Sequence, residues 1–307
     1  MHYNVTVFGV KDSSEIIIDY IAGEVADIDL VVTISQNAKN RNEIAGVTNT
    51  LQELCSGYGI PVFEADSYKL DDEKSRAFFA DNTFDLGLVV GWQRLIPPHV
   101  LDAFASGIFG FHGNAGYLPF GRGRSPLNWS ILLGDTRFNL NLFRYDEQAD
   151  SPNVFAREMF QISPHDDIRT AGYKNLICQK RLTAKLLACH REGTISVHTE
   201  SKDFDSWYEK RTAADGKIDF HARTREIHNL IRAVAAPFPG AFCYADEHKV
   251  TVWQARPFDE ILDFSMYAPG EVIDVFDGKP VVRTVDGSVL IDCYEADITL
   301  ERGMILA

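Results

Sequence analysis

Short apolar runs alternate with segments of helical spacing over the first third of the chain. Five runs have the length and composition of buried strands: residues 4–8, 29–34, 60–63, 85–90 and 108–111. Residues 16–21 and 44–55 have the spacing of amphipathic helices, and the Pro-Pro pair at 97–98 opens another. This alternation predicts an α/β domain with a doubly wound, mostly parallel sheet. Ligands bind beyond the carboxyl ends of such strands, so we expect the chemistry to follow residues 90 and 111.

The pattern changes after about residue 200. Helical spacing at residues 227–234 ends in a Pro-Phe-Pro-Gly turn, and Asp-Gly pairs at 277–278 and 286–287 predict hairpins. Five short β runs occupy this part of the chain: residues 241–244, 249–255, 270–276, 280–284 and 288–293. They predict a small C-terminal β-barrel of OB type. The length of 307 residues favours two domains, which we place at residues 1–204 and 205–307.

Composition narrows the choice of partners. The chain has 44 acidic and 30 basic residues, a net charge of −14, and a pI near 5.0. This balance argues against non-specific binding to nucleic acid or to anionic membranes. No apolar run approaches the roughly 18 residues of a membrane span, and the first residues are typical of a strand rather than of a signal peptide. Five scattered cysteines, none in Cys-x-x-Cys spacing, predict reduced thiols, no zinc or other metal site, and a cytoplasmic location.

Residues 107–152 carry the densest set of chemically active side chains. His112 follows the strand expected at residues 108–111, Asn114 comes two residues later, and Asp150 lies in an acidic cluster after a further predicted strand. If these side chains converge on one strand edge, they can catalyse acyl transfer to an amine. The imidazole relays the proton, the carboxylate orients the imidazole, and an amide donor stabilises the oxyanion. Spacing alone does not establish convergence, and an isolated His in a loop is more often ordinary polar surface.

Two motifs resemble those of the formyltransferases that use 10-formyltetrahydrofolate. The first comprises His112, Leu118-Pro119, Arg122-Gly123-Arg124-Ser125-Pro126-Leu127-Asn128-Trp129, Gly134-Asp135 and Asp150. The second comprises Arg211-Thr212-x-x-Asp215-Gly216-x-Ile218-Asp219, Ile231-Arg232-Ala233 and Pro237-Phe238-Pro239-Gly240-Ala241-Phe242, and is similar to the entry into that family's C-terminal domain. The Arg-Gly-Arg-x-Pro-Leu-Asn-Trp stretch is most similar to the branch that formylates amino sugars on nucleotides, which includes the aminoarabinose formyltransferases. The resemblance extends over nearly the whole chain and implies a Rossmann-like catalytic domain followed by an OB-like domain.

The resemblance implies a reaction and roles for three residues. The amine of a nucleotide-linked amino sugar attacks the formyl carbon of 10-formyltetrahydrofolate, while His112 handles the amine proton and Asp150 supports His112. The family carries an Asn two residues before this His, where the present chain has Gly110. Aligned instead on Leu118-Pro119, His112 takes the place of that Asn and Asn114 the place of the His. We favour His112 as the functional imidazole and Asn114 as the substitute amide donor, although Asn114 could be only a turn residue.

The resemblance also implies binding residues. Trp92, Arg94, Leu95, Ile96 and Asp146 are expected around the folate, although the segment after residue 90 is equally typical of a hydrophobic β–α turn. A second set, Arg122, Gly123 and Arg124, is expected to meet the phosphates of folate or sugar nucleotide, because guanidinium groups suit such oxyanions. Surface salt bridges are the alternative for the two arginines. A homodimer and a part in lipopolysaccharide or O-antigen synthesis are further implications.

Two other functions compete with sugar formylation. Methionyl-tRNA formyltransferase, in the same superfamily, requires a basic face for the tRNA. From Asp205 to the end the chain has 11 basic and 18 acidic residues, a net charge of −7, which disfavours that acceptor. A non-catalytic protein that binds a sugar nucleotide or folate is the second alternative, and the Gly at position 110 is the feature that favours it.

Overall fold

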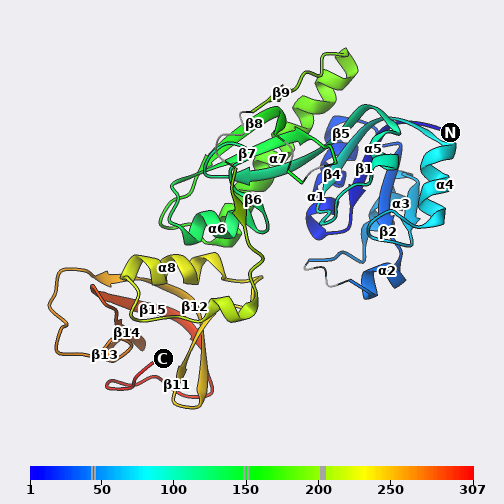
Figure 1. Ribbon diagram of the computed structural model, residues 1–307. Coiled ribbons are helices and arrows are strands. Elements are labelled where there is room, and N and C mark those ends of the chain that lie inside the picture. The colour runs from blue at the N-terminus through cyan, green and yellow to red at the C-terminus, as the bar shows by residue number, and fades with distance from the viewer. Residues whose placement is uncertain (43, 45, 148, 151, 201–204) are drawn as a thin grey trace. The chain divides into compact units, whose positions relative to one another are not determined.

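The computed structural model describes residues 1–307 except 43, 45, 148, 151 and 201–204 (Figure 1). The chain forms two compact units. Unit 1 comprises Met1–Gly123, Asn139–Phe160 and Asn175–Trp207, and unit 2 comprises Arg124–Phe138, Gln161–Lys174 and Tyr208–Ala307. The domain boundary expected between residues 204 and 205 lies at the edge of the stretch 201–204, which is outside the described residues.

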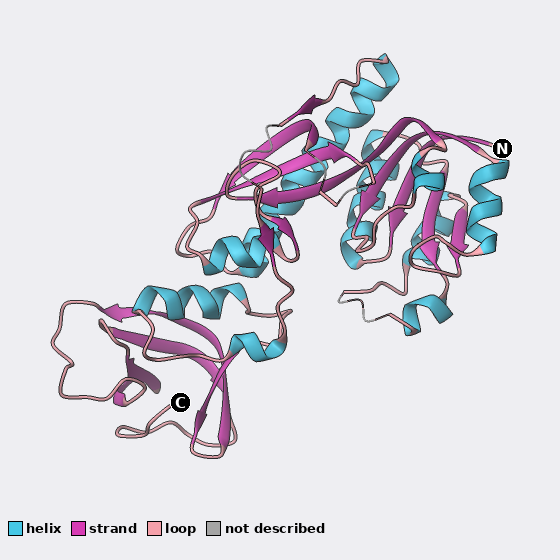
Figure 2. Ribbon diagram, viewed as in Figure 1, coloured by secondary structure: helices cyan, strands magenta, loops and turns pink. Residues whose placement is uncertain are grey.

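An eight-stranded sheet of order β3-β2-β1-β4-β5-β7-β8-β9 forms the larger sheet of the molecule (Figures 1 and 2). Its strands are β1 (His2–Gly9), β2 (Leu30–Ile34), β3 (Val62–Ala65), β4 (Thr83–Val90), β5 (Phe104–Asn114), β7 (Arg137–Arg144), β8 (Asn153–Gln161) and β9 (His198–Thr199). Strands β3 to β5 run parallel, whereas β5 and β7 pair antiparallel. The predicted doubly wound, mostly parallel α/β architecture is confirmed.

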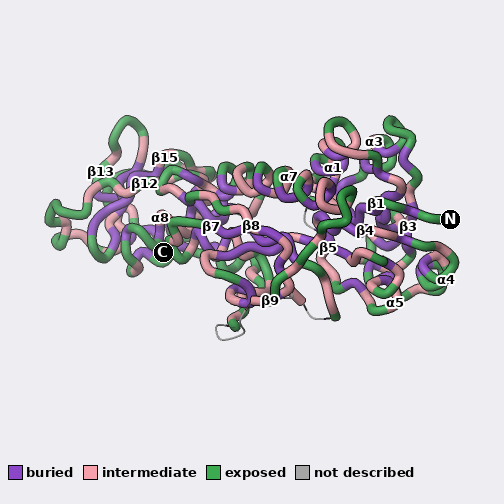
Figure 3. Tube along the Cα trace, turned by 90° about the horizontal axis from the view of Figure 1, so that it is seen from above, coloured by how far each residue is buried: buried purple, intermediate pink, exposed green. Residues whose placement is uncertain are grey.

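Helices cover both faces of the parallel part. Figure 3 shows α1 (Asp12–Tyr20) and α3 (Leu51–Tyr58) on one side, and α4 (Glu73–Asp81) and α5 (Pro98–Leu101) on the other. Strands β1, β2 and β4 are consequently buried on both faces, which explains their continuous apolar sequences. The unit also contains the π-helical turn η1 (Ile21–Val25) and the short helix α2 (Gln36–Asn40). The long helix α7 (Ile168–Glu192) follows β8.

Two predicted boundaries are wrong. The helix expected over residues 44–55 begins only at Leu51, because Gly46 has a φ of 68° and Val47 forms an antiparallel bridge with Lys11; residue 45 lies outside the described part. Strand β5 continues to Asn114 rather than ending at residue 111, because its ladder with β7 extends to the pair Asn114–Asn139. The residues expected to follow a strand therefore lie on it.

Unit 2 contains a five-stranded antiparallel sheet of order β11-β12-β15-β14-β13. Its elements are α6 (Pro126–Leu132), the 3-10 turn η2 (Ala213–Gly216), α8 (Thr224–Ala233), β11 (Ala241–Ala245), β12 (His248–Asp259), β13 (Val272–Phe276), β14 (Lys279–Arg283) and β15 (Ser288–Glu295). Helix α8 buries Ile227 and Ile231 and packs against α6 and β12. A two-stranded ribbon joins β6 (Arg122–Gly123) to β10 (Trp207–Tyr208).

The five predicted strands are confirmed, but the closed OB-like barrel is not. Within the described residues no ladder joins the edge strands β11 and β13. The last residues of the chain bond to both edges instead: Tyr244 exchanges two 2.8 Å hydrogen bonds with Ala307, and the Val272 N–H donates to the Met304 carbonyl at 2.8 Å. None of the described helices is long and apolar enough to span a membrane. All five cysteines are free thiols.

Candidate active site

Three positions on one face of β5 define the site. Side chains two residues apart in a strand point to the same side, so Gly110, His112 and Asn114 form a row. The antiparallel partners of this row on β7 are Phe143, Asn141 and Asn139. All three β5 positions are buried, and their edge of the sheet is the one at which ligands bind in this architecture.

His112 is held through both of its ring nitrogens. Nδ1 lies 3.2 Å from Oδ1 of Asp150, and Nε2 lies 2.7 Å from the Gly121 carbonyl oxygen. Both partners accept hydrogen bonds, and a neutral imidazole has only one N–H whereas an imidazolium has two. A neutral ring that donates from Nδ1 to Asp150 therefore has Nε2 as its basic nitrogen. The side chain is only 7% exposed, which shields this pair from solvent.

Asp150 joins the imidazole to the glycine-rich loop. Its second oxygen, Oδ2, accepts a 3.0 Å hydrogen bond from the Gly123 N–H, and its φ of 50° places it in the left-handed region. The structure thus brings together His112 and Asp150, which are 38 positions apart, at the distance that the predicted chemistry requires. The backbone of Gly123 belongs to the same cluster.

The side-chain amide of Asn114 is bonded to the backbone rather than free to donate to an oxyanion. Its side chain is fully buried, and Nδ2 donates to the Phe120 carbonyl. Its Oδ1 has no hydrogen-bond partner among the described residues. The amide therefore closes the loop that leaves β5, and the geometry gives it a role in holding that loop.

Two further buried amides support the row, and the sequence reasoning missed both. Asn141 donates to the His112 carbonyl at 3.1 Å and accepts from Arg157 Nε at 2.7 Å, while Asn139 donates to the carbonyls of Ala115 and Gly116. The alternation of Asn139 and Asn141 in an otherwise apolar strand was the available signal, because buried amides need partners.

Arg157 extends this network to Glu200 and Tyr117. It forms an ion pair with Glu200 and its guanidinium lies over the Tyr117 ring, 4.1 Å from the centroid. Burial opposes ionisation of Glu200, but hydrogen bonds from Arg157 and His198 outweigh it and lower the pKa of the carboxyl group. The arginine is therefore a fixed cation that contacts the loop after β5 through Tyr117.

The two arginines expected at phosphates differ in their environments. Arg122 is mostly buried, makes a two-pronged ion pair with Asp205, and lies over the Trp207 ring at 4.4 Å from the centroid. The salt-bridge alternative thus describes Arg122. Arg124 is exposed, and we find no side-chain partner for it within the described part of the chain.

The residues expected around folate also divide into two groups. Trp92 and Ile96 are buried in the core beside β4, where Trp92 packs edge-on against Tyr68 and its indole N–H has no described acceptor. Leu95 is 57% exposed and is free to contact a ligand ring. Arg94 is half-buried and bonds to Asn42.

Asp146, the remaining expected folate residue, lies in the acidic loop that also carries Asp150. It is half-buried, and Asn153 Nδ2 lies 3.4 Å from its Oδ2. Ser151, which follows Asp150, is outside the described residues. No group of three or more His, Cys, Asp or Glu side chains in the described ranges is arranged to hold a metal ion.

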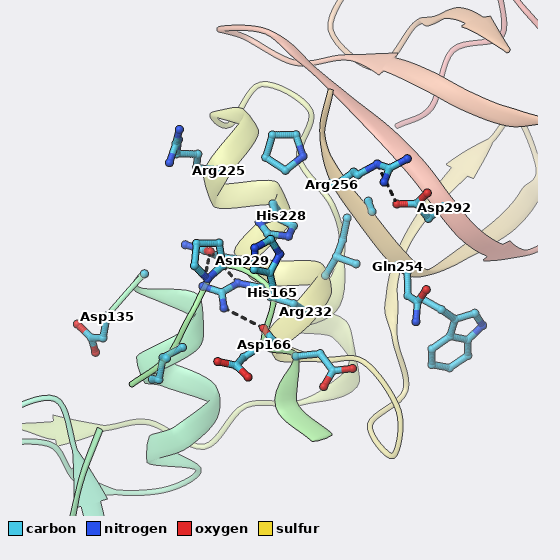
Figure 4. A pocket seen from close by; sticks show the side chains of 18 of the residues that line it. Asp135, His165, Asp166, Arg225, His228, Asn229, Arg232, Gln254, Arg256 and Asp292 are labelled. Carbon is cyan, nitrogen blue, oxygen red and sulfur yellow. Dashed lines mark hydrogen bonds and ion pairs between the residues drawn. The ribbon is translucent and has the colours of Figure 1, made fainter. Parts of the chain in front are cut away.

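Unit 2 has a separate cavity of about 880 Å³ beside α8 (Figure 4). Two of its arginines are engaged within the protein: Arg256 pairs with Asp292, and Arg232 donates to Asn229 and to the carbonyls of Ser163 and Asp166. Burial, followed by the charges of nearby arginines, lowers the pKa of His228 to about 4. None of the predicted catalytic residues lines this cavity.

Comparison with known families identifies the class of protein. The model described as "Formyl transferase" matches residues 3–187, which is more than half of the chain. The model described as "Formyl transferase, C-terminal domain" matches residues 210–297. The chain therefore belongs to the formyl transferase family.

Solved structures of similar fold include two N-formyltransferases and HypX. An N-formyltransferase from Helicobacter canadensis, solved with folinic acid and dTDP-3-aminofucose, has a TM-score of 0.67 and 15% identity, covering 94% of this chain and 98% of that one. WlaRD, a sugar 3N-formyl transferase solved with dTDP and 5-N-formyl-THF, has a TM-score of 0.67 and 16% identity, covering 97% and 98%. HypX from Aquifex aeolicus, solved with tetrahydrofolic acid, has a TM-score of 0.62 and 18% identity; the present chain is covered fully but spans only 46% of HypX. These similarities establish the shared fold.

Proposed function

We propose that this protein transfers the formyl group of 10-formyltetrahydrofolate to the amine of a nucleotide-linked amino sugar. The observation that carries the proposal is the contact of the buried His112 with Asp150 at the carboxyl end of β5 in a chain of the formyl transferase family. Two proteins of similar fold and nearly equal length, solved with folates and dTDP or a dTDP sugar, support this choice of donor and acceptor.

In the proposed reaction His112 receives the proton of the attacking amine. Its Nε2 is the ring nitrogen that faces the loop, and the substrate amine replaces the Gly121 carbonyl as its partner. Asp150 remains on Nδ1 and stabilises the imidazolium as it forms. We assign Asn114 to holding the loop, because its amide already bonds to Phe120.

Binding of the substrates is assigned to the residues that the family resemblance implies. Leu95 presents an apolar side chain to the pterin ring, and Arg94 lies next to it in the loop after β4. Trp92 and Ile96 support that loop from the core, and Asp146 lies in the loop after β7. Arg124 is available to a phosphate, whereas Arg122 must first leave Asp205.

The acidic C-terminal part supports a small acceptor rather than a tRNA. From Asp205 onward the net charge is −7, and phosphate contacts on tRNA require Lys and Arg. A homodimer and a cytoplasmic location remain part of the proposal.

Steady-state rates with 10-formyltetrahydrofolate and amino sugars linked to dTDP, UDP, GDP or CMP test this function. We expect saturable release of tetrahydrofolate with one nucleotide class and none with initiator methionyl-tRNA. Salt-sensitive formylation of the tRNA, with no turnover of any sugar, would show that the protein is a methionyl-tRNA formyltransferase instead. A folded protein that binds sugar nucleotide or folate without turnover would be the non-catalytic alternative.

A further inference from the structure

Gly110 lacks a side chain for a steric reason. Its φ is not in the left-handed region, so its backbone does not require glycine. A Cβ at this position would lie 2.5 Å from Cε1, 2.6 Å from the hydroxyl oxygen and 2.7 Å from Cζ of Tyr145. The polar end of the Tyr145 ring therefore fills the place that a residue-110 side chain would take.

That place belongs to the same row as His112. Positions 110 and 112 are two residues apart on one face of β5, a spacing of roughly 7 Å along a strand. The phenol oxygen of Tyr145 consequently occupies the position next to His112 in that row, on the side of the sheet toward which both positions point. Aligned on the strand, the chain lacks the family's amide at residue 110, and the structure places a tyrosine hydroxyl where that side chain would lie.

The ring of Tyr145 is held in this position. It follows β7 directly, its N–H donates to the Ile108 carbonyl at 2.8 Å, and its ring stacks on Phe143 with centroids 5.0 Å apart. It also packs against two clusters of buried apolar residues. A donor fixed before the substrate arrives needs no reorganisation during the reaction.

The hydroxyl is available as a donor. Within the described part of the chain it has no hydrogen-bond partner, whereas the amides of Asn114 and Asn141 are both bonded to backbone carbonyls. Burial, together with the charges of Asp150 and Tyr68, raises the pKa of the Tyr145 phenol. The proton therefore stays on the oxygen at physiological pH.

We propose that the Tyr145 hydroxyl donates the hydrogen bond that stabilises the oxyanion of formyl transfer, replacing the amide absent at residue 110. This inference rests on the proposed function. The amine nitrogen forms a bond to the formyl carbon, and the carbonyl electron pair moves to the oxygen, which accepts the Tyr145 hydrogen bond. The amine nitrogen gives one proton to His112. On collapse the carbonyl re-forms, the bond to folate nitrogen N10 breaks with its electron pair, and that nitrogen takes up the proton from His112, so atoms and charge balance without another reactant.

The test is Tyr145→Phe, which removes only the hydroxyl. We expect kcat to fall on the order of 100- to 1,000-fold, the typical loss of one oxyanion donor, while KM for both substrates changes less than about threefold. Tyr20→Phe, a half-buried tyrosine on α1, is the matched control and should retain the wild-type rate. The double variant Gly110→Asn/Tyr145→Ala returns an amide to the vacated space and should be faster than Tyr145→Ala alone.

A binding measurement separates this proposal from the proposed function. By titration calorimetry, wild type should bind 10-formyl-5,8-dideazafolate, a stable analogue of the donor, more tightly than 5,8-dideazafolate. Tyr145→Phe should lose that preference and keep its affinity for the unformylated analogue. A Tyr145→Phe enzyme within threefold of the wild-type kcat, with the preference intact, overturns the role of Tyr145 alone. A folded wild type that binds neither analogue overturns the proposed function and this role with it.

Discussion

Replacing Asp150 with Asn isolates the contribution of one carboxylate to catalysis. Asparagine has nearly the same shape and tolerates the left-handed conformation at this position, where φ is 50°. Its amide oxygen can still accept the Gly123 N–H, so the loop keeps its anchor. What is lost is the charged partner of His112 Nδ1, now 3.2 Å away.

The size of the effect follows from that single contact. A hydrogen bond that involves a charged group contributes about 1.5–3 kcal/mol. With about 1.4 kcal/mol for each tenfold change, Asp150→Asn should lower kcat about 10- to 150-fold. Removal of the imidazole in His112→Ala should cost more, on the order of 100- to 10,000-fold, because the proton acceptor itself is absent.

Initial rates of tetrahydrofolate formation at saturating donor and acceptor measure this effect. Glu147→Gln, which removes an exposed carboxylate from the same loop, is the matched control and should stay close to wild type. The reasoning is refuted if Asp150→Asn retains more than a third of the wild-type kcat, or if Glu147→Gln loses as much. Unchanged thermal unfolding of Asp150→Asn excludes general loss of structure as the cause.

Three further predictions concern stability, all in unit 2. The pKa of Asp166 is lowered to about 2 because hydrogen bonds, first that from Lys174, outweigh its burial. Asp166→Asn should therefore lower the free energy of unfolding by about 2 kcal/mol at pH 7. Urea titrations should show this difference vanishing as the pH falls from about 4 toward 2. The pKa of His228 is lowered to about 4, chiefly by burial. The unfolded state therefore binds an extra proton between pH 6.5 and 4, and the stability falls as the pH drops through this range. His228→Gln should remove up to about 3 kcal/mol of this acid sensitivity, which a flatter profile of Tm against pH would show. Asn128→Ala leaves the buried Ala233 carbonyl without its 2.8 Å donor and should cost about 1–3 kcal/mol in chemical denaturation.

The sheet was predictable from sequence because its strands are buried on both faces. Strands β1, β2 and β4 have unbroken apolar sequences that local pattern detects. The helix predicted to begin at residue 44 begins only at Leu51, which shows the limit of prediction from local pattern. Apolar periodicity continues through residues 44–50, but the bridge from Val47 to Lys11 is a long-range contact that no local pattern encodes.

The sequence indicates which residues form the candidate site, but it does not indicate which of them are in contact. His112 and Asp150 were identified from motif and chemistry, and only the fold brings them to 3.2 Å. The sequence also showed that Gly110 departs from the family pattern. That Tyr145 fills the vacant place depends on the register between β5 and β7, in which Gly110 pairs with Phe143, and register is set by tertiary packing. The prediction of a closed barrel was not confirmed for a related reason, because the number of strands alone does not determine whether the edge strands pair.

The central claim is formyl transfer to a sugar amine by the His112–Asp150 pair, and following the formyl carbon tests it most directly. 10-Formyltetrahydrofolate labelled with ¹³C in the formyl group is incubated with the nucleotide-linked amino sugars, and the products are analysed by mass spectrometry and NMR. We predict that wild type places the label on the sugar nitrogen as a formamide and that His112→Ala does so at least 100-fold more slowly. Label that never reaches a sugar nitrogen, or reaches it equally fast in His112→Ala, would contradict the account.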